Sequence, residues 1–160
     1  MVHKTAYTMR FRRRREGKTD YKKRLALLKS GKPRLIVRVR GRSVVAQIVR
    51  FTPKGDLVAA GATSADITKL YGFTGHTGNA EASYLVGMLC GKRALKAGVK
   101  EAVLDIGLHT PVGGSNVFAA LKGAVEAGMQ VPHSDDCFPP AEKVKTGAGK
   151  AALEKIAKGV

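Results

Sequence analysis

Four consecutive arginines near the start of the chain are the strongest constraint on how it can fold. They stand in segment 10–16, whose single acid is Glu16. Adjacent guanidinium groups repel one another, and inside a core each would need a buried partner of opposite charge. The segment supplies no such set of partners. We therefore expect an exposed arm that stays loose until an anion orders it.

The positive charge is concentrated at the same end of the chain. The 160 residues carry a formal net charge of +17. Residues 1–50 hold 17 Lys and Arg but only Glu16 and Asp20 as acids, a net charge of +15, and the remainder holds +2. Solubility alone does not need so local an excess. The distribution indicates a polyanionic partner such as nucleic acid.

The rest of the composition is typical of one globular domain. Hydrophobic residues make up 44% and charged residues 26% of the chain. The longest nearly uncharged stretches, such as 57–65, are much shorter than the ~18 apolar residues of a membrane span. No apolar region typical of a secretory signal precedes the arginines, and two cysteines are too few for a disulfide scaffold. We expect a cytoplasmic protein without a membrane partner.

A short helix is predicted directly after the arm. Thr19 or Asp20 is suited to cap its N-terminus, and Gly31 to follow its C-terminus. Apolar side chains recur at helical spacing at Tyr21, Leu25 and Leu28, which predicts a helix over about 20–29.

Three β-rich runs follow, over 35–40, 44–51 and 57–62, and short turns separate them. They predict a three-stranded antiparallel meander. Alternation along the first run puts its apolar side chains on one face, namely Leu35, Val37 and Val39. The other face then carries Arg34, Arg38 and Arg40, and no acid stands between Tyr21 and Lys54. We expect this second face to be cationic and exposed.

The second half of the chain alternates helix and strand. One or two helical turns over 66–71 precede a long helix that begins after Asn79 and ends at Gly98. A short buried strand over 101–106 and a helix between Ser115 and Gly128 follow. Beyond Val131, prolines interrupt regular structure before a short helix at 151–157. The Lys/Ala-rich stretch 143–150 predicts a solvated extension.

These elements predict an α/β fold, with a mixed sheet in a β-β-β-α-β-α core. We divide the chain into a basic arm with a short helix (1–31), a globular α/β core (32–131) and a C-terminal extension (132–160). The core order resembles a fragment of the ribonuclease H-like fold. Nucleases of that fold hold metal on carboxylates that begin on the first strand, and 34–40 contains no acid. Nuclease activity is therefore disfavoured.

RNA is the polyanion that the arm fits best. Arginine binds phosphate bidentately, and aromatic side chains among the cations can stack on unpaired bases. Tyr7 and Phe11 are such residues, whereas Tyr21 either stacks on a base or packs against Leu25. The candidate RNA-binding residues are Arg10, Phe11, Arg12, Arg13, Arg14, Arg15, Lys18, Tyr21, Lys22, Lys23, Arg24, Lys32, Arg34, Arg38, Arg40, Arg42, His76 and Asn79.

Other kinds of site have weaker support. His133 and Cys137 could supply two metal ligands, but a structural zinc site needs four. The same pair lacks an orienting group and an oxyanion hole for nucleophilic catalysis. Loop 107–115 leads from a strand into a helix N-terminus, yet it matches no nucleotide-binding motif. We interpret it as a tight turn that could meet an RNA phosphate, and we expect no catalytic residue, metal or cofactor.

Several strings resemble one known family. They are RFRRRREGKTDYKKRL, SGKPRLIVR, GHTGN, AVLDIGL, GGSNVFAALKGAVEAG and VPHS, which together span about residues 10–134. The sequence resembles the archaeal large-subunit ribosomal proteins of the L-eighteen type, shorter relatives of the eukaryotic L-five protein. The Lys/Ala-rich tail 141–160 departs from the Arg- and Gly-containing tail of that family.

The resemblance implies a structural protein of the large ribosomal subunit. It implies that the chain binds 5S rRNA and helps to attach it to the large-subunit rRNA, beside other ribosomal proteins of the central protuberance. It also implies that Arg10, the arginines 12–15, Lys18, Tyr21 and Arg24 form the main 5S-binding region, with loop 75–79 near RNA. From the residues alone, a general nucleic-acid packaging protein and a small nucleotide-dependent enzyme remain alternatives.

Overall fold

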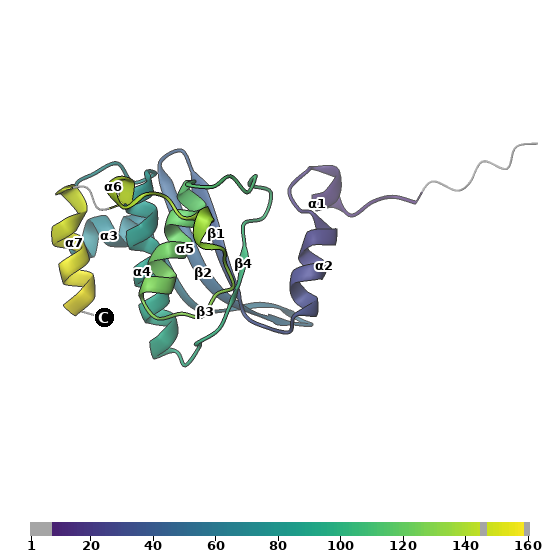
Figure 1. Cartoon of the computed structure of the whole chain (residues 1–160). Helices are drawn as coiled ribbons and strands as arrows, with labels where there is room; N and C mark the ends of the chain where they lie inside the picture. Colours follow the sequence, from purple (N-terminus) through teal and green to yellow (C-terminus); the bar gives the residue numbers. More distant parts are fainter. Residues whose placement is uncertain (1–7, 145–146, 159–160) are drawn as a thin grey trace, which may run out of the picture.

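A four-stranded mixed sheet forms the centre of the molecule (Figure 1). The computed structural model describes residues 8–144 and 147–158. The elements are α1 (Arg12–Arg15), α2 (Tyr21–Lys29), β1 (Arg34–Arg40), β2 (Ser43–Thr52), β3 (Gly55–Thr63), α3 (Ser64–Tyr71), α4 (Ala80–Lys96), β4 (Val103–Asp105), α5 (Asn116–Glu126), a 3-10 turn (Asp135–Cys137), α6 (Ala141–Val144) and α7 (Gly147–Lys158).

The strand order in the sheet is β3-β2-β1-β4. The pairs β1–β2 and β2–β3 are antiparallel, which confirms the predicted meander. Strand β4 joins the other edge of β1 in parallel, with Leu35 opposite Leu104 and Ile36 opposite Asp105. The predicted mixed α/β sheet is therefore confirmed, and the parallel pair places Asp105 on the same face as Arg34 and Arg38.

Helices α3, α4, α5 and α7 lie on one side of the sheet, and α1 and α2 lie on the other (Figure 1). The predicted inward side chains Leu35 and Val37 are fully buried on the helix side, together with Val44 and Ile48 of β2. A Cβ atom on Gly87 of α4 would lie within van der Waals overlap of the Ala120 backbone of α5. The two core helices therefore pack backbone to backbone.

Helix ends are set by the residues that the sequence indicated. The Asp20 carboxylate accepts hydrogen bonds from the amides of Lys22 (3.0 Å) and Lys23 (3.2 Å), so Asp20 caps α2. Asn79 caps α4 by accepting from the Ala82 amide at 2.7 Å. Gly98 follows α4 with φ +74°, a conformation that other residues adopt at a cost.

The C-terminal segment packs on the core, so the solvated extension predicted for 143–150 is wrong, whereas α7 confirms the helix predicted at 151–157. Val144, Ala152 and Ile156 are buried, and α7 lies against α3 and α4. Glu81 of α4 accepts a hydrogen bond from the Gly149 amide (2.8 Å), and Lys92 donates to the carbonyls of residues 156 and 157. The Glu81 carboxylate lies at the N-terminus of α7 and the Lys92 ammonium lies at its C-terminus, so both charges interact favourably with the helix dipole of α7.

The orientation of α2 also differs from the prediction. Leu25 is 57% exposed, whereas Tyr21, Arg24, Leu27 and Leu28 are partly buried. The predicted apolar face of the helix, which includes Leu25, therefore does not face the sheet. Arg24 takes part in the contact with the sheet instead. Tyr21 lies against Phe11, with ring centroids 5.3 Å apart. Tyr7 lies outside the described residues.

Candidate nucleic-acid interface

The arginine block forms one exposed helical turn instead of the loose segment that the sequence predicts. No residue of α1 is buried. Within the arm, Arg13 Nε donates to Thr19 Oγ1 at 2.9 Å, and Lys18 pairs with Glu16 at 2.9 Å. Because Glu16 also lies 3.9 Å from Arg12, one carboxylate faces two cations. The arm thus keeps a large excess of positive charge on its surface.

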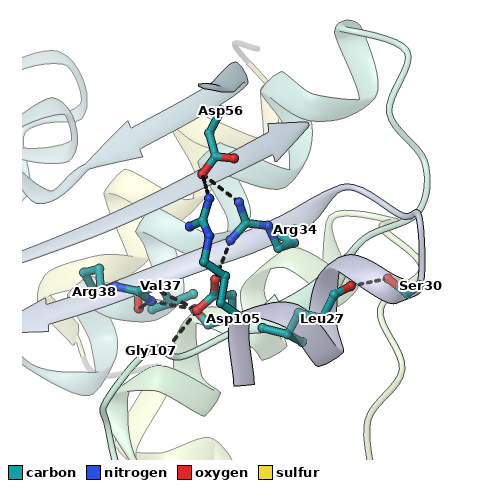
Figure 2. Close-up of polar contacts among 9 residues, drawn as sticks. Leu27, Ser30, Arg34, Val37, Arg38, Asp56, Asp105 and Gly107 are labelled. Atoms are coloured by element: carbon teal, nitrogen blue, oxygen red, sulfur yellow. Dashed lines mark hydrogen bonds and ion pairs between the residues drawn. The ribbon is translucent and has the colours of Figure 1, made fainter. Parts of the chain in front are cut away.

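Beneath α2, three arginines and two aspartates form an arginine–aspartate cluster, defined here as Arg24, Arg34, Arg38, Asp56 and Asp105 (Figure 2). Arg34 Nη2 lies 2.7 Å from Asp56 Oδ2, and its Nη1 lies 2.9 Å from Asp105 Oδ2. Arg24 Nη2 approaches the same Asp56 oxygen at 2.9 Å. The cluster therefore links α2 to the sheet through three strands.

Arg38 occupies the open end of this cluster. Its Nη1 donates to the carbonyls of Val37 (2.8 Å) and Asp105 (2.7 Å), and its Nη2 lies 3.0 Å from Asp105 Oδ1. The Gly107 amide donates to the same carboxylate at 2.9 Å. At Gly107, with φ +64°, a Cβ would lie 2.8 Å from the guanidinium carbon of Arg38. A glycine at this position therefore lets the guanidinium sit against the backbone.

The three arginines of β1 do not form the exposed cationic face that alternation predicted. The Arg34 side chain is 1% exposed and that of Arg38 is 38% exposed, whereas Arg40 is exposed. The expectation of an exposed Arg34 is wrong because Asp56 and Asp105 enclose its guanidinium. Lys32 is also engaged, since its Nζ lies 2.7 Å from Glu101.

The two aspartates are the residues that sequence reasoning missed. Asp56 follows the turn into β3, and Asp105 ends β4, so neither stands near Arg34 in the sequence. They could have been found by assigning the alternating side chains of every strand, and not only those of β1, to the two faces of the sheet. With β1 between β2 and β4, Asp105 falls opposite Ile36 and shares the face of Arg34 and Arg38.

Asp56 is held in its charged form. Burial by itself would raise the pKa of Asp56, but the hydrogen bonds from Arg24 and Arg34 and the charges of both arginines outweigh burial and lower that pKa. The ionised carboxylate is therefore the stable partner of both guanidinium groups at neutral pH.

Acidification below about pH 4 is expected to weaken the docking of α2, since a free aspartate titrates near that pH. The folded-state pKa of Asp56 lies below the unfolded value, so the ion pairs contribute fully above the unfolded value and are lost as pH falls through the folded one. A ¹³C NMR titration of the Asp56 carboxyl should show a lowered midpoint that Arg24→Ala raises. Equal midpoints in the two proteins would contradict the Arg24 contact.

A second group of candidate residues meets at the turn between β1 and β2. Thr77 Oγ1 donates to the Arg42 carbonyl at 2.7 Å, so loop 75–79 docks on this turn. A Cβ on Gly78 would clash with the Gly41 carbonyl, and this close approach needs glycine. His76 is exposed there, and its Nδ1 accepts from the Gly78 amide at 3.2 Å. The Oδ1 atom of Asn79 is committed to the cap of α4.

Several backbone amides of loop 107–115 already have partners within the protein. The Gly114 amide donates to the Cys137 carbonyl at 3.0 Å, and the Ser115 amide to the Val112 carbonyl at 3.3 Å. The Gly107 amide is bound to Asp105. Ser115 forms no side-chain cap of α5, so these bonds engage amides of the loop and not those of the first turn of the helix. The contact of this turn with an RNA phosphate therefore stays a prediction.

Eight exposed candidate cations form no ion pair with the part of the chain that the structure describes. Arginines predominate among them, and most belong to the arm and α2. They are Arg10, Arg13, Arg14, Arg15, Lys22, Lys23, Arg40 and Arg42. These side chains are available to an external anion, whereas Arg24, Arg34 and Arg38 already have partners in the protein.

The two thiols are poorly suited to catalysis. Burial raises the pKa of the Cys90 thiol to about 12, and burial also raises the pKa of Cys137. Both thiols are therefore protonated at neutral pH, and the thiolate is the nucleophilic form. Within residues 8–144 and 147–158, no cluster of three or more His, Cys, Asp or Glu side chains could hold a metal ion, and no helix is long and apolar enough to cross a membrane.

Comparison with known proteins identifies relatives over most of the chain. Residues 5–102 and 96–134 match the family model described as ribosomal large subunit proteins 60S L5, and 50S L18. The large ribosomal subunit protein uL18 of Caldivirga maquilingensis is 49% identical over 144 residues, which cover 90% of this chain and 70% of the relative. The uL18 proteins of Methanothermobacter thermautotrophicus and Thermofilum pendens are each 50% identical over 145 residues, which cover 91% of this chain and 75% and 74% of the relatives.

Proposed function

Because the chain belongs to the family of ribosomal large-subunit proteins 60S L5 and 50S L18, we propose that it binds 5S rRNA and helps to attach this RNA to the large-subunit rRNA in the central protuberance. Membership of this family makes the chain a structural constituent of the large ribosomal subunit and not an enzyme. Its partners in that subunit are rRNA and ribosomal proteins.

One observation carries the proposal: Arg13, Arg14 and Arg15 are exposed on the turn α1, and their guanidinium groups form no ion pair with the residues that the structure describes. Arginine side chains bind phosphate bidentately, and each neutralised phosphate releases counterions. The cations Lys22 and Lys23 of α2 extend this charge toward the sheet. The arm and α2 therefore provide the main phosphate-binding surface.

Two further features favour a folded RNA. Phe11 is 72% exposed beside Tyr21, so an aromatic pair stands among the cations where unpaired bases can stack. Arg40, Arg42 and His76 form a second exposed group at the turn between β1 and β2. Some candidate residues that have partners in the protein are proposed to contact RNA through their exposed atoms, namely Lys18, Arg24, Lys32 and Arg38. Asn79 is proposed to contact RNA through its side-chain NH₂ group. Arg34 is proposed to act indirectly, by holding the strands of this surface together.

A preference for 5S rRNA over other nucleic acids tests the proposal. We expect filter binding at about 0.15 M salt to give an affinity for 5S rRNA at least 10³-fold higher than for a DNA duplex of equal length, because specific complexes exceed non-specific ones by that order. Equal affinities at matched salt would support a general packaging protein instead. Cosedimentation of the native protein with large subunits, and its release together with 5S rRNA, checks the same proposal in the ribosome.

A further inference from the structure

A groove separates the arm and α2 from the segment that runs from β4 into α5. Its volume is about 1040 Å³. Residues 13–27 line one side, and residues 104–111 line the other, with Arg38 between them. The groove is thus open to solvent beside the phosphate-binding surface proposed above.

The α1–α2 side of the groove is cationic. Arg13, Lys18 and Lys23 line it, and all three side chains are exposed. Arg24 and Arg38 also reach the groove, and the arginine–aspartate cluster holds their guanidinium groups in place. A polyanion that enters here meets cations whose positions are partly fixed before binding, which lowers the entropic cost of ordering them.

The opposite side has a different chemistry. Leu108 lines it and is 55% exposed, next to the partly buried side chains of Ile106 and His109. This side therefore presents two aliphatic side chains and one imidazole ring. An apolar surface with a flat imidazole ring suits the faces of nucleobases, which stack on aromatic and apolar side chains. It does not suit phosphates.

We infer that this groove binds a short unpaired segment of the RNA, with phosphates toward Arg13, Lys18 and Lys23 and bases toward Ile106, Leu108 and His109. The inference rests on the proposed function and assigns it a single-stranded target. A double helix keeps its base faces stacked on one another and cannot present them to Leu108. The volume of about 1040 Å³ lies just above the ~300–1,000 Å³ typical of sites that enclose small ligands. It therefore suits one or two nucleotides and excludes a duplex.

The test compares the apolar side of the groove with a matched position outside it. In the full chain, Leu108→Ser together with His109→Ala removes the proposed base contacts, and Val112→Ser is the control. Val112 is 57% exposed and lies in the same loop, but it does not line the groove. Circular dichroism melting of the three proteins checks that all are folded before binding is measured.

We expect the double variant to bind 5S rRNA about tenfold more weakly than the wild type, a loss within the range for one base stack. Its affinity for a fully paired RNA duplex should not change. The slope of log affinity against log salt should also stay the same, because both substitutions leave Arg13, Lys18 and Lys23 in place. The Val112→Ser control should match the wild type on both RNAs.

The outcomes separate this inference from the proposed function. A wild-type protein with equal affinity for 5S rRNA and duplex would overturn the proposed function and the groove assignment with it. A wild-type preference for 5S rRNA that the double variant keeps in full would overturn the groove assignment alone. A poly-glutamate peptide provides a further test. If the peptide binds the wild type but not the double variant, and both proteins bind 5S rRNA equally, the groove assignment is overturned, because the groove would then bind an acidic protein partner.

Discussion

Replacing Arg12, Arg13, Arg14 and Arg15 together by glutamine is expected to lower the affinity for 5S rRNA by about 10²-fold or more near 0.15 M salt. Each of these side chains is exposed on α1, and within residues 8–144 and 147–158 only Arg12 among the four forms an ion pair, 3.9 Å from Glu16. If all four meet phosphates, the slope of log affinity against log salt should become shallower by about three, at about 0.7 per contact. Filter binding between 50 and 200 mM salt measures both quantities.

The matched control removes the same charge elsewhere. Lys69, Lys96, Lys100 and Lys155 are exposed and belong to α3, the end of α4, the loop after it, and α7. Their joint replacement by glutamine should leave the salt slope nearly unchanged, because these positions lie outside the proposed interface. An equal loss of affinity in the two quadruple variants would mean that net charge, and not the arm, determines RNA binding.

The secondary structure could largely be predicted because its signals are local. Apolar spacing, the caps Asp20 and Asn79, and the glycines after α2 and α4 place most helix ends within a few residues. The meander likewise follows from alternation and short turns between strands. Such signals depend only on near neighbours in the chain, so a single sequence contains them.

The environment of each side chain was harder to predict because it depends on distant segments. Arg34 has no acid within 13 residues on either side, yet Asp56 and Asp105 surround it once β3 and β4 join the sheet. Alternation correctly separates the two faces of β1, but it does not say what covers the second face. Helix α2 and the two aspartates cover it at Arg34 and leave Arg40 exposed.

The environment of the tail 141–160 was also hard to predict, because side chains that the composition suggests to be exposed are buried. Its Lys/Ala-rich composition is typical of a solvated segment, and Val144, Ala152 and Ile156 are widely spaced in it. Helix formation brings Ala152 and Ile156 onto one face, four residues apart, where they pack on α3 and α4. Composition averages over a segment and so misses a narrow apolar stripe.

The location of Arg34 leads to the largest expected effect on stability. Arg34→Ala should lower the free energy of unfolding by about 3 kcal/mol, the lower end of the usual cost of removing one partner from a buried ion pair, because each aspartate keeps a second arginine. Asp105 is 6% exposed, and without Arg34 it would keep Arg38 as its remaining cation, while Asp56 would keep Arg24. Urea unfolding followed by circular dichroism measures this loss.

Arg40→Ala is the matched control on the same face of the same strand. Arg40 is exposed and forms no ion pair with the described residues, so its replacement should change stability by no more than about 0.5 kcal/mol. Its effect should appear in RNA binding instead, as a salt slope shallower by about one. Similar unfolding curves for the two variants would contradict the burial of Arg34. A further variant combines Arg34→Met with Asp56→Asn and Asp105→Asn. A marked recovery of its stability relative to Arg34→Met would show that the charge imbalance at the two aspartates, and not lost packing, causes the destabilisation, because a buried ion-pair network can be exchanged for neutral side chains at little cost.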